Sequence, residues 1–330
     1  MLNKLSISRF FEWLTESQHN LKSFSILRII YGVALLFVLV PSTPERSMLW
    51  GEASFWVDPE ASRRGYWTFD VLFAKDSTLL FEVAFFGLIA LAIMFIVGWR
   101  TRVVTPIMLL LLVSLQSNNP YTLNGGDTLI RVTLLFMLFA NLSEHYSFDA
   151  KRNSQLSKPR KKIVPQHVSN AAHNTGLILS CFQIVVVYST SGIWKIIGDD
   201  WLNGTALFYA LRIDNFMLYP AINELLWQSS LVIYVATFLA LWVQTLFPLW
   251  ILWRPTRIFA LVSLIFMHLG IGLLLGLWPF SLVMIALDML FIRDSTWSRI
   301  LLWIKSTKVY DRSRALSESS KRFLVPNTMH

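Results

Sequence analysis

Long apolar runs are the feature that most limits what this 330-residue chain can fold into. A helix needs about 20 predominantly apolar residues to cross the hydrocarbon core of a bilayer, and such runs recur along the sequence. Hydrophobic residues make up 55% of the chain and charged residues only 15%, whereas soluble domains carry about 25% charged residues. The sequence therefore predicts a polytopic membrane protein. It excludes a soluble enzyme, a disordered protein and a nucleic-acid-binding domain.

Apolar windows predict an all-α membrane bundle of about eight transmembrane helices. The windows cover residues 24–41, 78–97, 103–117, 128–141, 174–193, 229–253, 258–277 and 279–292. The third, fourth and eighth windows are short for a full crossing, so tilt or interfacial flanking residues would have to complete them. We expect residues 24–292 to form one transmembrane domain.

The positions of Lys and Arg orient this bundle. If the N-terminus is inside, the cytoplasmic segments are 1–23, 98–102, 142–173, 254–257 and 293–330, and they hold 21 of the 29 Lys and Arg residues. The outer loops hold six. Because cytoplasmic loops carry an excess of Lys and Arg, both termini are predicted to be cytoplasmic. The net charge of +9 then reflects anchoring on anionic lipid rather than a nucleic-acid partner, in a multi-pass protein of the cell membrane.

The two cytoplasmic ends each show helical spacing of apolar residues, which is typical of amphipathic helices on a membrane surface. These apolar residues are Ile7, Phe10, Phe11 and Leu14 in segment 1–23, and Trp297, Ile300, Leu301 and Ile304 in segment 293–330. Two outer loops, 42–77 and 194–228, are long and rich in aromatic residues, which suggests that they lie on the outer interface or cover a cavity.

Five ionisable residues fall inside predicted spans: Arg28, Glu82, Arg131, His268 and Asp288. An ionisable residue within a span is a functional hypothesis by default. Three of them lie near a span end, where a structural role such as snorkelling is the alternative. His268 lies near the middle of its span, so it is either a proton carrier or cavity ligand, or a neutral histidine that bonds to a neighbouring helix.

The stretch between residues 117 and 131 (SNNPYTLNGGDTLIR) is unusually polar for a membrane domain. Asn118, Asn119 and Asn124 are costly there unless they face water or a partner. We expect Asp127 to be the N-cap of the following helix and Arg131, at i+4, to pair with it. The stretch is then either a self-contained cap and ion pair or the polar floor of an outward-facing cavity.

The fifth predicted span ends in a second polar stretch around Lys195 (YSTSGIWKIIGDDWLNGTALFYAL). Lysine is disfavoured on the outer side of a membrane, and the aromatic residues Trp194 and Trp201 would exclude water from the ammonium group. A lysine whose charged form is poorly solvated can act as a base. The alternatives are contact with lipid headgroups or an ion pair with Asp199, at i+4.

Several kinds of chemistry have no support in the residues. A single cysteine, Cys181, excludes an intramolecular disulfide and a cysteine-rich metal site. The sequence has no HExxH, paired-histidine, CxxC, P-loop or GxSxG pattern. We therefore predict no metal site, and we find no support for an ATPase or an elbow-type serine hydrolase.

Several blocks of this sequence resemble one family. The blocks LRIIYGVALLF, GWRTR, NNPYTLNGGDTLIR with the later SFDA, YSTSGIWKIIGDDWLNGTALFYAL and FMHLGIGL occur in family order between about residues 26 and 292. They resemble the HTTM domain, the membrane domain shared by vitamin K-dependent gamma-carboxylases and many bacterial relatives. By that resemblance Lys195 would be the catalytic base and a reduced quinone the cofactor. His268 is a further catalytic candidate.

The resemblance is closer in size to a bacterial branch of the family than to the carboxylases, which carry a large lumenal region that this sequence does not replace. That branch includes the membrane subunit that matures the sporulation-delaying peptide toxin of bacilli. It implies an outer-face modification or maturation of a secreted peptide or a lipid-soluble substrate, together with a companion maturation protein. The alternative is a non-catalytic membrane component that binds, escorts or confers immunity to an exported peptide.

Overall fold

Helices form all the regular structure that can be described in this protein. The computed structural model describes residues 2–51, 77–155, 164–304 and 306, and among these residues every regular element is a helix. Within this part of the chain, five helices are long and apolar enough to cross a membrane singly. They are α2 (Leu21–Leu39), α5 (Thr78–Val97), α6 (Thr101–Asn118), α9 (Gln166–Ile197) and α15 (Arg254–Leu275). The protein is therefore an all-α polytopic membrane protein.

The described residues contain five or six candidate spans, fewer than the eight or so transmembrane helices predicted. Helices occupy all eight predicted ranges, but α7 (Gly125–Met137) has 13 residues and α16 (Trp278–Asp288) has 11. At about 1.5 Å per residue they measure roughly 20 and 16 Å, short of a hydrocarbon core of about 30 Å. A sixth span exists if α12 (Pro220–Trp227) and α13 (Ser230–Thr245) count as one, although they meet at an angle of 93°.

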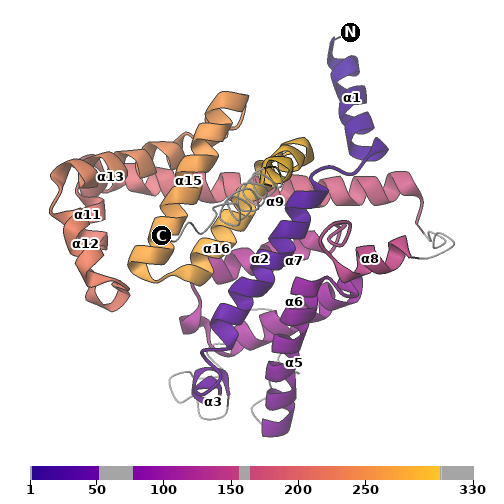
Figure 1. The fold of residues 1–330 in the computed structure, drawn as a ribbon, viewed down its shortest axis with the longest axis horizontal. Coiled ribbons are helices and arrows are strands. Elements are labelled where there is room, and N and C mark those ends of the chain that lie inside the picture. Colours follow the sequence, from indigo (N-terminus) through magenta and orange to yellow (C-terminus); the bar gives the residue numbers. More distant parts are fainter. Residues whose placement is uncertain (1, 52–76, 156–163, 305, 307–330) are drawn as a thin grey trace, which may run out of the picture.

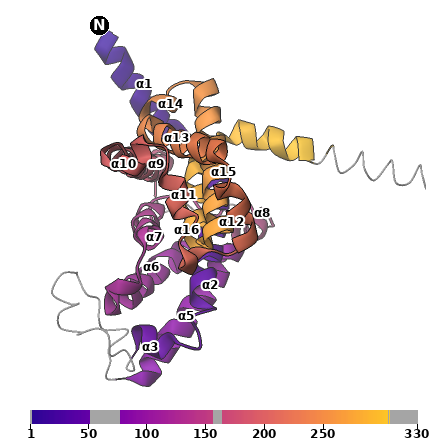
Figure 2. The ribbon, with the colours of Figure 1, turned by 90° about the vertical axis from the view of Figure 1, so that its left-hand side faces the viewer.

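The helices pack around α2 and α16. Helix α2 lies between α5 and α16, and α16 also packs along α15 (Figures 1 and 2). The long helix α9 runs across this bundle, with α1 (Leu2–Glu16) near its first residues and α13 along its second half (Figure 1). The side chains between these helices are apolar and fully buried, as at Leu88, Leu264 and Leu287. This packing brings the C-terminal helix α16 beside the N-terminal helix α2.

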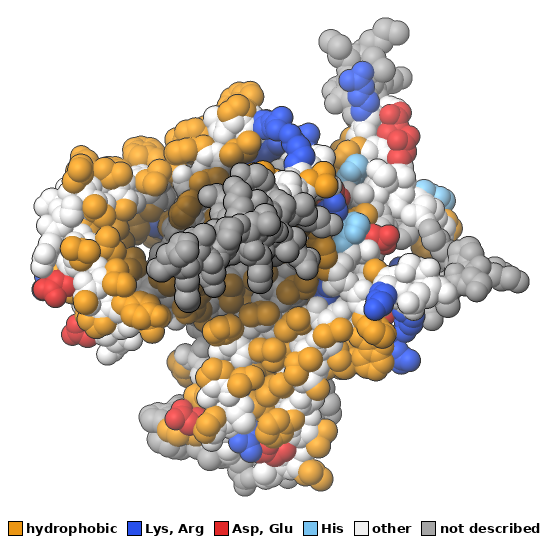
Figure 3. All heavy atoms as spheres, in the orientation of Figure 1, with side chains coloured by type: hydrophobic (Ala, Val, Ile, Leu, Met, Phe, Trp, Pro, Cys, Tyr) orange, Lys and Arg blue, Asp and Glu red, His pale blue; other side chains and the backbone are white. Residues whose placement is uncertain are grey.

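The outside of the bundle is apolar, as a lipid-facing surface must be. Hydrophobic side chains cover much of the face in Figure 3, and charged side chains lie mostly around its edges. Helix α5 illustrates the pattern, because Leu79 is 75% exposed and Val83 is 63% exposed. A soluble protein rarely leaves such large continuous apolar patches in water.

Arg28 is a structural residue that ties three segments together. Its guanidinium is fully buried and donates to the carbonyls of Phe95 and Ile96 at the end of α5, and to those of Leu142 and Tyr146. A guanidinium can serve several carbonyls because it carries five N–H donors and stays charged. The snorkelling alternative is therefore wrong for Arg28, which instead caps the C-terminal end of α5, where the helix dipole favours a cation.

Both predicted terminal amphipathic helices are present as helices. Two asparagines of α9 hold helix α1 in place. Asn170 donates to the backbone carbonyls of residues 15 and 16, and Asn174 donates to those of residues 13, 14 and 17. Residues 294–304 are also helical, and the Asp294 carboxylate accepts from the first backbone N–H groups of α2. The predicted position of both helices on the cytoplasmic membrane surface, and the cytoplasmic location of both termini, stay predictions.

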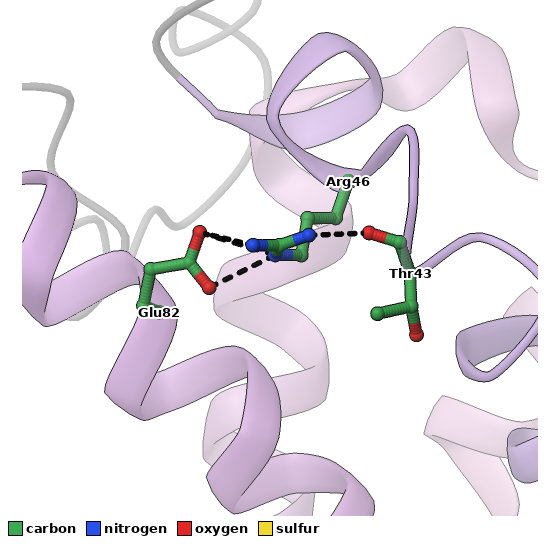
Figure 4. A network of polar contacts seen from close by, with 3 residues as sticks. All are labelled: Thr43, Arg46 and Glu82. Carbon is green, nitrogen blue, oxygen red and sulfur yellow. Dashed lines mark hydrogen bonds and ion pairs between the residues drawn. The ribbon is translucent and has the colours of Figure 1, made fainter.

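Glu82, in the first turns of α5, forms a local ion pair with Arg46. Arg46, in the short helix α3 (Arg46–Trp50), places Nε 2.9 Å and Nη2 2.9 Å from the two carboxylate oxygens of Glu82 and donates from Nη1 to the carbonyl of Thr43 (Figure 4). Hydrogen bonding to Glu82 raises the pKa of Arg46 above its ordinary value. This bidentate pair joins α3 to the start of α5. Residues 52–76 of the same loop lie outside the described residues.

Candidate functional site

One face of α9 carries the polar side chains of the candidate site. Tyr188, Ser191 and Lys195 are spaced i, i+3 and i+7, which places them on the same side of a helix. Gly192 brings α13 against this part of α9, because a Cβ atom at that position would lie 2.5 Å from Thr245 Cα. Only glycine allows such a close approach of two helix backbones. The approach places Gln244, the residue before Thr245, beside Lys195.

Lys195 is half-buried and has three contacts. Its Nζ donates to Ser191 Oγ at 2.5 Å and to Gln244 Oε1 at 2.7 Å. It also lies 4.8 Å from the centroid of the Trp201 ring. The hydroxyl and amide oxygens accept hydrogen bonds here, and the face of an indole ring attracts a cation. These contacts suit a charged ammonium group.

Gln244 has only one orientation that satisfies its neighbours. Its Oε1 accepts from Lys195 Nζ and, at 3.1 Å, from Ser191 Oγ, while its Nε2 donates to Met267 Sδ at 3.1 Å. An ammonium group can only donate and a thioether sulfur can only accept. The amide is therefore fixed with its oxygen toward the lysine.

A second polar cluster lies deeper in the bundle and consists of Tyr188, His268 and Asp288. The Tyr188 hydroxyl oxygen lies 3.0 Å from His268 Nε2 and 3.0 Å from both carboxylate oxygens of Asp288. The three side chains are 1%, 2% and 0% exposed. The other ring nitrogen of His268, Nδ1, is buried and has no hydrogen-bond partner among the described residues. Its ring lies edge-on to Phe280 with centroids 5.7 Å apart.

The two clusters lie close together because α9 and α15 each contribute residues to both of them. Tyr188 and Lys195 share one face of α9, and Met267, which accepts from Gln244, directly precedes His268 on α15. The first cluster has a half-buried lysine, and the second is enclosed by the bundle. Together they form one polar region where α9 and α15 lie close to each other.

The structure brings three of the predicted site residues into this region, namely Lys195, Trp201 and His268. It does not bring Trp194 there, because that side chain is 71% exposed; the predicted aromatic wall therefore consists of Trp201 alone. Asp199 is exposed in the first turn of α10 (Asp199–Leu202). Among the described residues Lys195 forms no ion pair with Asp199, since its Nζ points to Ser191 and Gln244 instead.

The remaining predicted residues lie at the end of α6, in the turn that follows it and in the first turns of α7, and they make structural contacts. Asn118 and Asn119 donate to the carbonyls of Trp50 and Leu49, at 3.2 and 2.8 Å. These bonds fasten α3 to the end of α6. A role of the turn as a cavity floor stays a prediction.

The predicted cap of α7 is wrong in its detail. Asn124, rather than Asp127, is the N-cap, and its Oδ1 accepts from the backbone N–H groups of Gly126 and Asp127. Asp127 occupies the third helical position and accepts from the backbone N–H of Asn124 at 2.8 Å, which completes a capping box. Arg131 donates to Thr128 at 3.4 Å, and the described residues include no ion pair between Arg131 and Asp127. The capping box satisfies the carboxylate, so the pair is not needed.

Sequence analysis missed Gln244, Tyr188 and Asp288 as members of the site. An uncharged amide inside an apolar helix was the signal for Gln244, and the i, i+3, i+7 spacing with Lys195 was the signal for Tyr188. Asp288 was treated as a residue near a span end, yet it is fully buried. Among the described residues no three His, Cys, Asp or Glu side chains are grouped so as to hold a metal ion.

Comparison with known proteins places this geometry in a family. Two proteins of Bacillus subtilis (strain 168) are similar: the uncharacterized protein YitO is 27% identical over 241 residues, which are 67% of this chain and 72% of that protein. The sporulation-delaying protein SdpB is 22% identical over 243 residues, which are 70% of each chain. No solved structure matches the chain. The HTTM domain model matches residues 17–297, so it covers the whole bundle and both polar clusters, and this chain belongs to the HTTM domain family.

Proposed function

We propose that this protein modifies or matures a secreted peptide or a lipid-soluble substrate at the outer face of the cell membrane, with Lys195 as the reacting residue. The observation that carries the proposal is the position of Lys195. It is a half-buried lysine beside three buried ionisable or hydroxyl groups, Tyr188, His268 and Asp288. Polar and ionisable residues inside a membrane domain are costly and mark substrate or proton pathways.

The similarity to a sporulation-delaying protein supports a peptide substrate and a companion maturation protein. A base at Lys195 would have to be neutral for part of the cycle. A neutral amine keeps two N–H donors, which still serve Ser191 and Gln244, and its lone pair is then free to accept a proton. A reduced quinone, which the resemblance to the carboxylases implies, needs such a neutral amine. The present contacts allow a neutral amine, but no contact among the described residues points to a site for a quinone ring, so we derive no quinone-dependent step.

A second candidate function is a non-catalytic component that binds or escorts an exported peptide, or confers immunity to it. One observation favours it: Nζ lies 4.8 Å from the centroid of the Trp201 ring, whose face attracts a charged ammonium. In that case the lysine is a fixed cation, and its remaining N–H donor would bind a carboxylate or carbonyl group of the peptide.

Two substitutions separate these functions. Arginine keeps the positive charge but stays charged at any working pH, so Lys195→Arg abolishes a base and preserves much of a cationic binding site. Lys195→Met removes both. The assay compares secreted peptides by mass spectrometry in a deletion strain complemented with wild type, each variant, or the exposed control Asp199→Asn. Loss of the wild-type product with both Lys195 variants supports the first function. Full activity of Lys195→Arg refutes it and supports the second.

A further inference from the structure

The cluster of Tyr188, His268 and Asp288 consists of three titratable side chains, whereas a structural hydrogen bond between helices needs only a donor and an acceptor. Each residue comes from a different helix, α9, α15 or α16, and each is almost completely buried. Among the described residues no Lys or Arg forms an ion pair with Asp288. Burying an unpaired charge is very costly. A proton shared among the three groups removes that cost, because Asp288 is then neutral.

The hydrogen-bond geometry allows two arrangements of the protons. In the first, Tyr188 donates to an ionised Asp288 and accepts from His268 Nε2–H, which leaves Nδ1 as a bare acceptor. In the second, a protonated Asp288 donates to the Tyr188 oxygen, Tyr188 donates to His268 Nε2, and Nδ1 carries the hydrogen. Both arrangements use the same three distances of 3.0 Å. They differ by one proton.

A single uptake event converts the first arrangement into the second. A proton binds His268 Nδ1 while the Nε2 proton passes to the Tyr188 oxygen and the Tyr188 proton passes to Asp288. The imidazole is neutral before and after, and the cluster changes from one negative charge to none. Nδ1 is the end of the chain at which a proton enters or leaves, and within the described part of the protein it has no hydrogen-bond partner.

We propose that Asp288, Tyr188 and His268 form a proton-transfer chain in which Asp288 stores a proton that is exchanged through His268 Nδ1. Its coupling to chemistry at Lys195 rests on the function proposed above, whereas proton storage does not. The second arrangement is the resting state, because it places no net charge in the apolar interior.

The charged groups on the surrounding helices have other partners. Lys195 on α9 donates to Ser191 and Gln244, and Arg28 on α2 donates to four backbone carbonyls. Asp127 on α7 belongs to the capping box. Asp288 therefore depends on Tyr188 and His268 for its proton.

Infrared spectroscopy of the purified full chain in lipid nanodiscs tests the proposal without any substrate. A protonated carboxyl group has its own C=O stretching band. We expect such a band in the wild type at neutral pH, its loss in Asp288→Asn and its persistence in the exposed control Asp199→Asn. Tyr188→Phe should shift the band, because the carboxyl group loses its hydrogen-bond partner.

Transfer into D2O tests the path of the proton. The wild-type band should shift as the carboxyl proton exchanges with deuterium. In His268→Gln, whose side-chain amide can still bond to Tyr188 but cannot pass a proton, we expect this exchange to be lost. Tyr188→Phe interrupts the chain at a second position with little change in volume, so it gives an independent reading if His268→Gln does not fold, which circular dichroism reports.

Three results would overturn the proposal: no band at neutral pH, a band unmoved by Tyr188→Phe, or exchange as fast in the interrupted chains as in the wild type. The Lys195→Arg result does not enter this test. A failure of the proposed function with an intact infrared response therefore removes the coupling to Lys195 and leaves the proton chain in place.

Discussion

Gly192→Ala is the change that most directly tests the contact on which the candidate site depends. The added methyl group would lie 2.5 Å from Thr245 Cα and 2.7 Å from Thr245 N. These are backbone atoms, so no side-chain rotation relieves the clash. Ordinary contact begins at 3.4 Å, so α9 and α13 must separate by about 1 Å. Overpacking of this kind costs about 1–3 kcal/mol.

The separation also affects Lys195. Its 2.7 Å hydrogen bond to Gln244 Oε1 spans the same pair of helices, and a separation of about 1 Å lengthens it beyond hydrogen-bond range. We therefore expect Gly192→Ala to lose stability and the activity that depends on Lys195 together. Gly270 in α15 supplies the matched control, because a Cβ atom there has nothing within 4 Å. Gly270→Ala should be neutral or gain up to about 1 kcal/mol, since alanine favours the helix.

The assay is reversible unfolding of the purified protein, titrated from mild detergent into sodium dodecyl sulfate and followed by circular dichroism. A difference of about 1–3 kcal/mol between the two variants is expected. Equal stabilities for Gly192→Ala and Gly270→Ala would mean that α9 and α13 do not touch at this point, and the geometry of the Lys195 cluster would then be wrong.

Three further changes have defined outcomes. Arg28→Gln leaves several buried carbonyls without a donor and should cost at least about 3 kcal/mol, whereas the exposed control Arg102→Gln should stay within about 0.5 kcal/mol in the same unfolding assay. Asn124→Ala removes the N-cap of α7 and should cost about 1 kcal/mol, and an unchanged midpoint relative to the exposed control Asn153→Ala would contradict the cap. In a Cys181→Ser background, a cysteine at position 212 should react with an impermeant reagent in intact cells and one at position 156 should not; the opposite pattern would invert the predicted topology.

The sequence predicted the helices well because apolar runs report helix existence directly. It predicted less about their ends and angles. The bend of 93° between α12 and α13 follows from how these helices pack, and no residue between positions 227 and 230 requires it. The cap of α7 was misassigned because Asn124 and Asp127 are equally good capping residues, and only the helix start decides between them.

Only some residues of the candidate site could be predicted from the sequence, and the reason is again physical. Lys195 and His268 stand out because a charge or an imidazole is unexpected in an apolar helix. Their partners carry weaker signals: Gln244 and Tyr188 are uncharged, and they acquire their roles only when α13 and α16 pack against α9. The polar residues of the α6–α7 turn look equally conspicuous, yet Asn118 and Asn119 are occupied by backbone carbonyls. A polar residue in an apolar segment costs free energy unless it has a partner. Only the contacts in the structure tell whether that partner is a structural group or part of a reactive site.

That distinction separates the α6–α7 turn from the region of Lys195 and His268. Asn118, Asn119, Asn124 and Asp127 bond to backbone groups of the turn or of α3, so these bonds exist as long as this end of the bundle is folded. In the region of Lys195 and His268 most bonds run between side chains of different helices, and Nδ1 of His268 has no hydrogen-bond partner among the described residues. Side-chain partners can exchange protons or release a donor to a ligand without unfolding a helix. A reactive centre needs that freedom, and in the described part of this family member the region where α9, α13, α15 and α16 meet provides it.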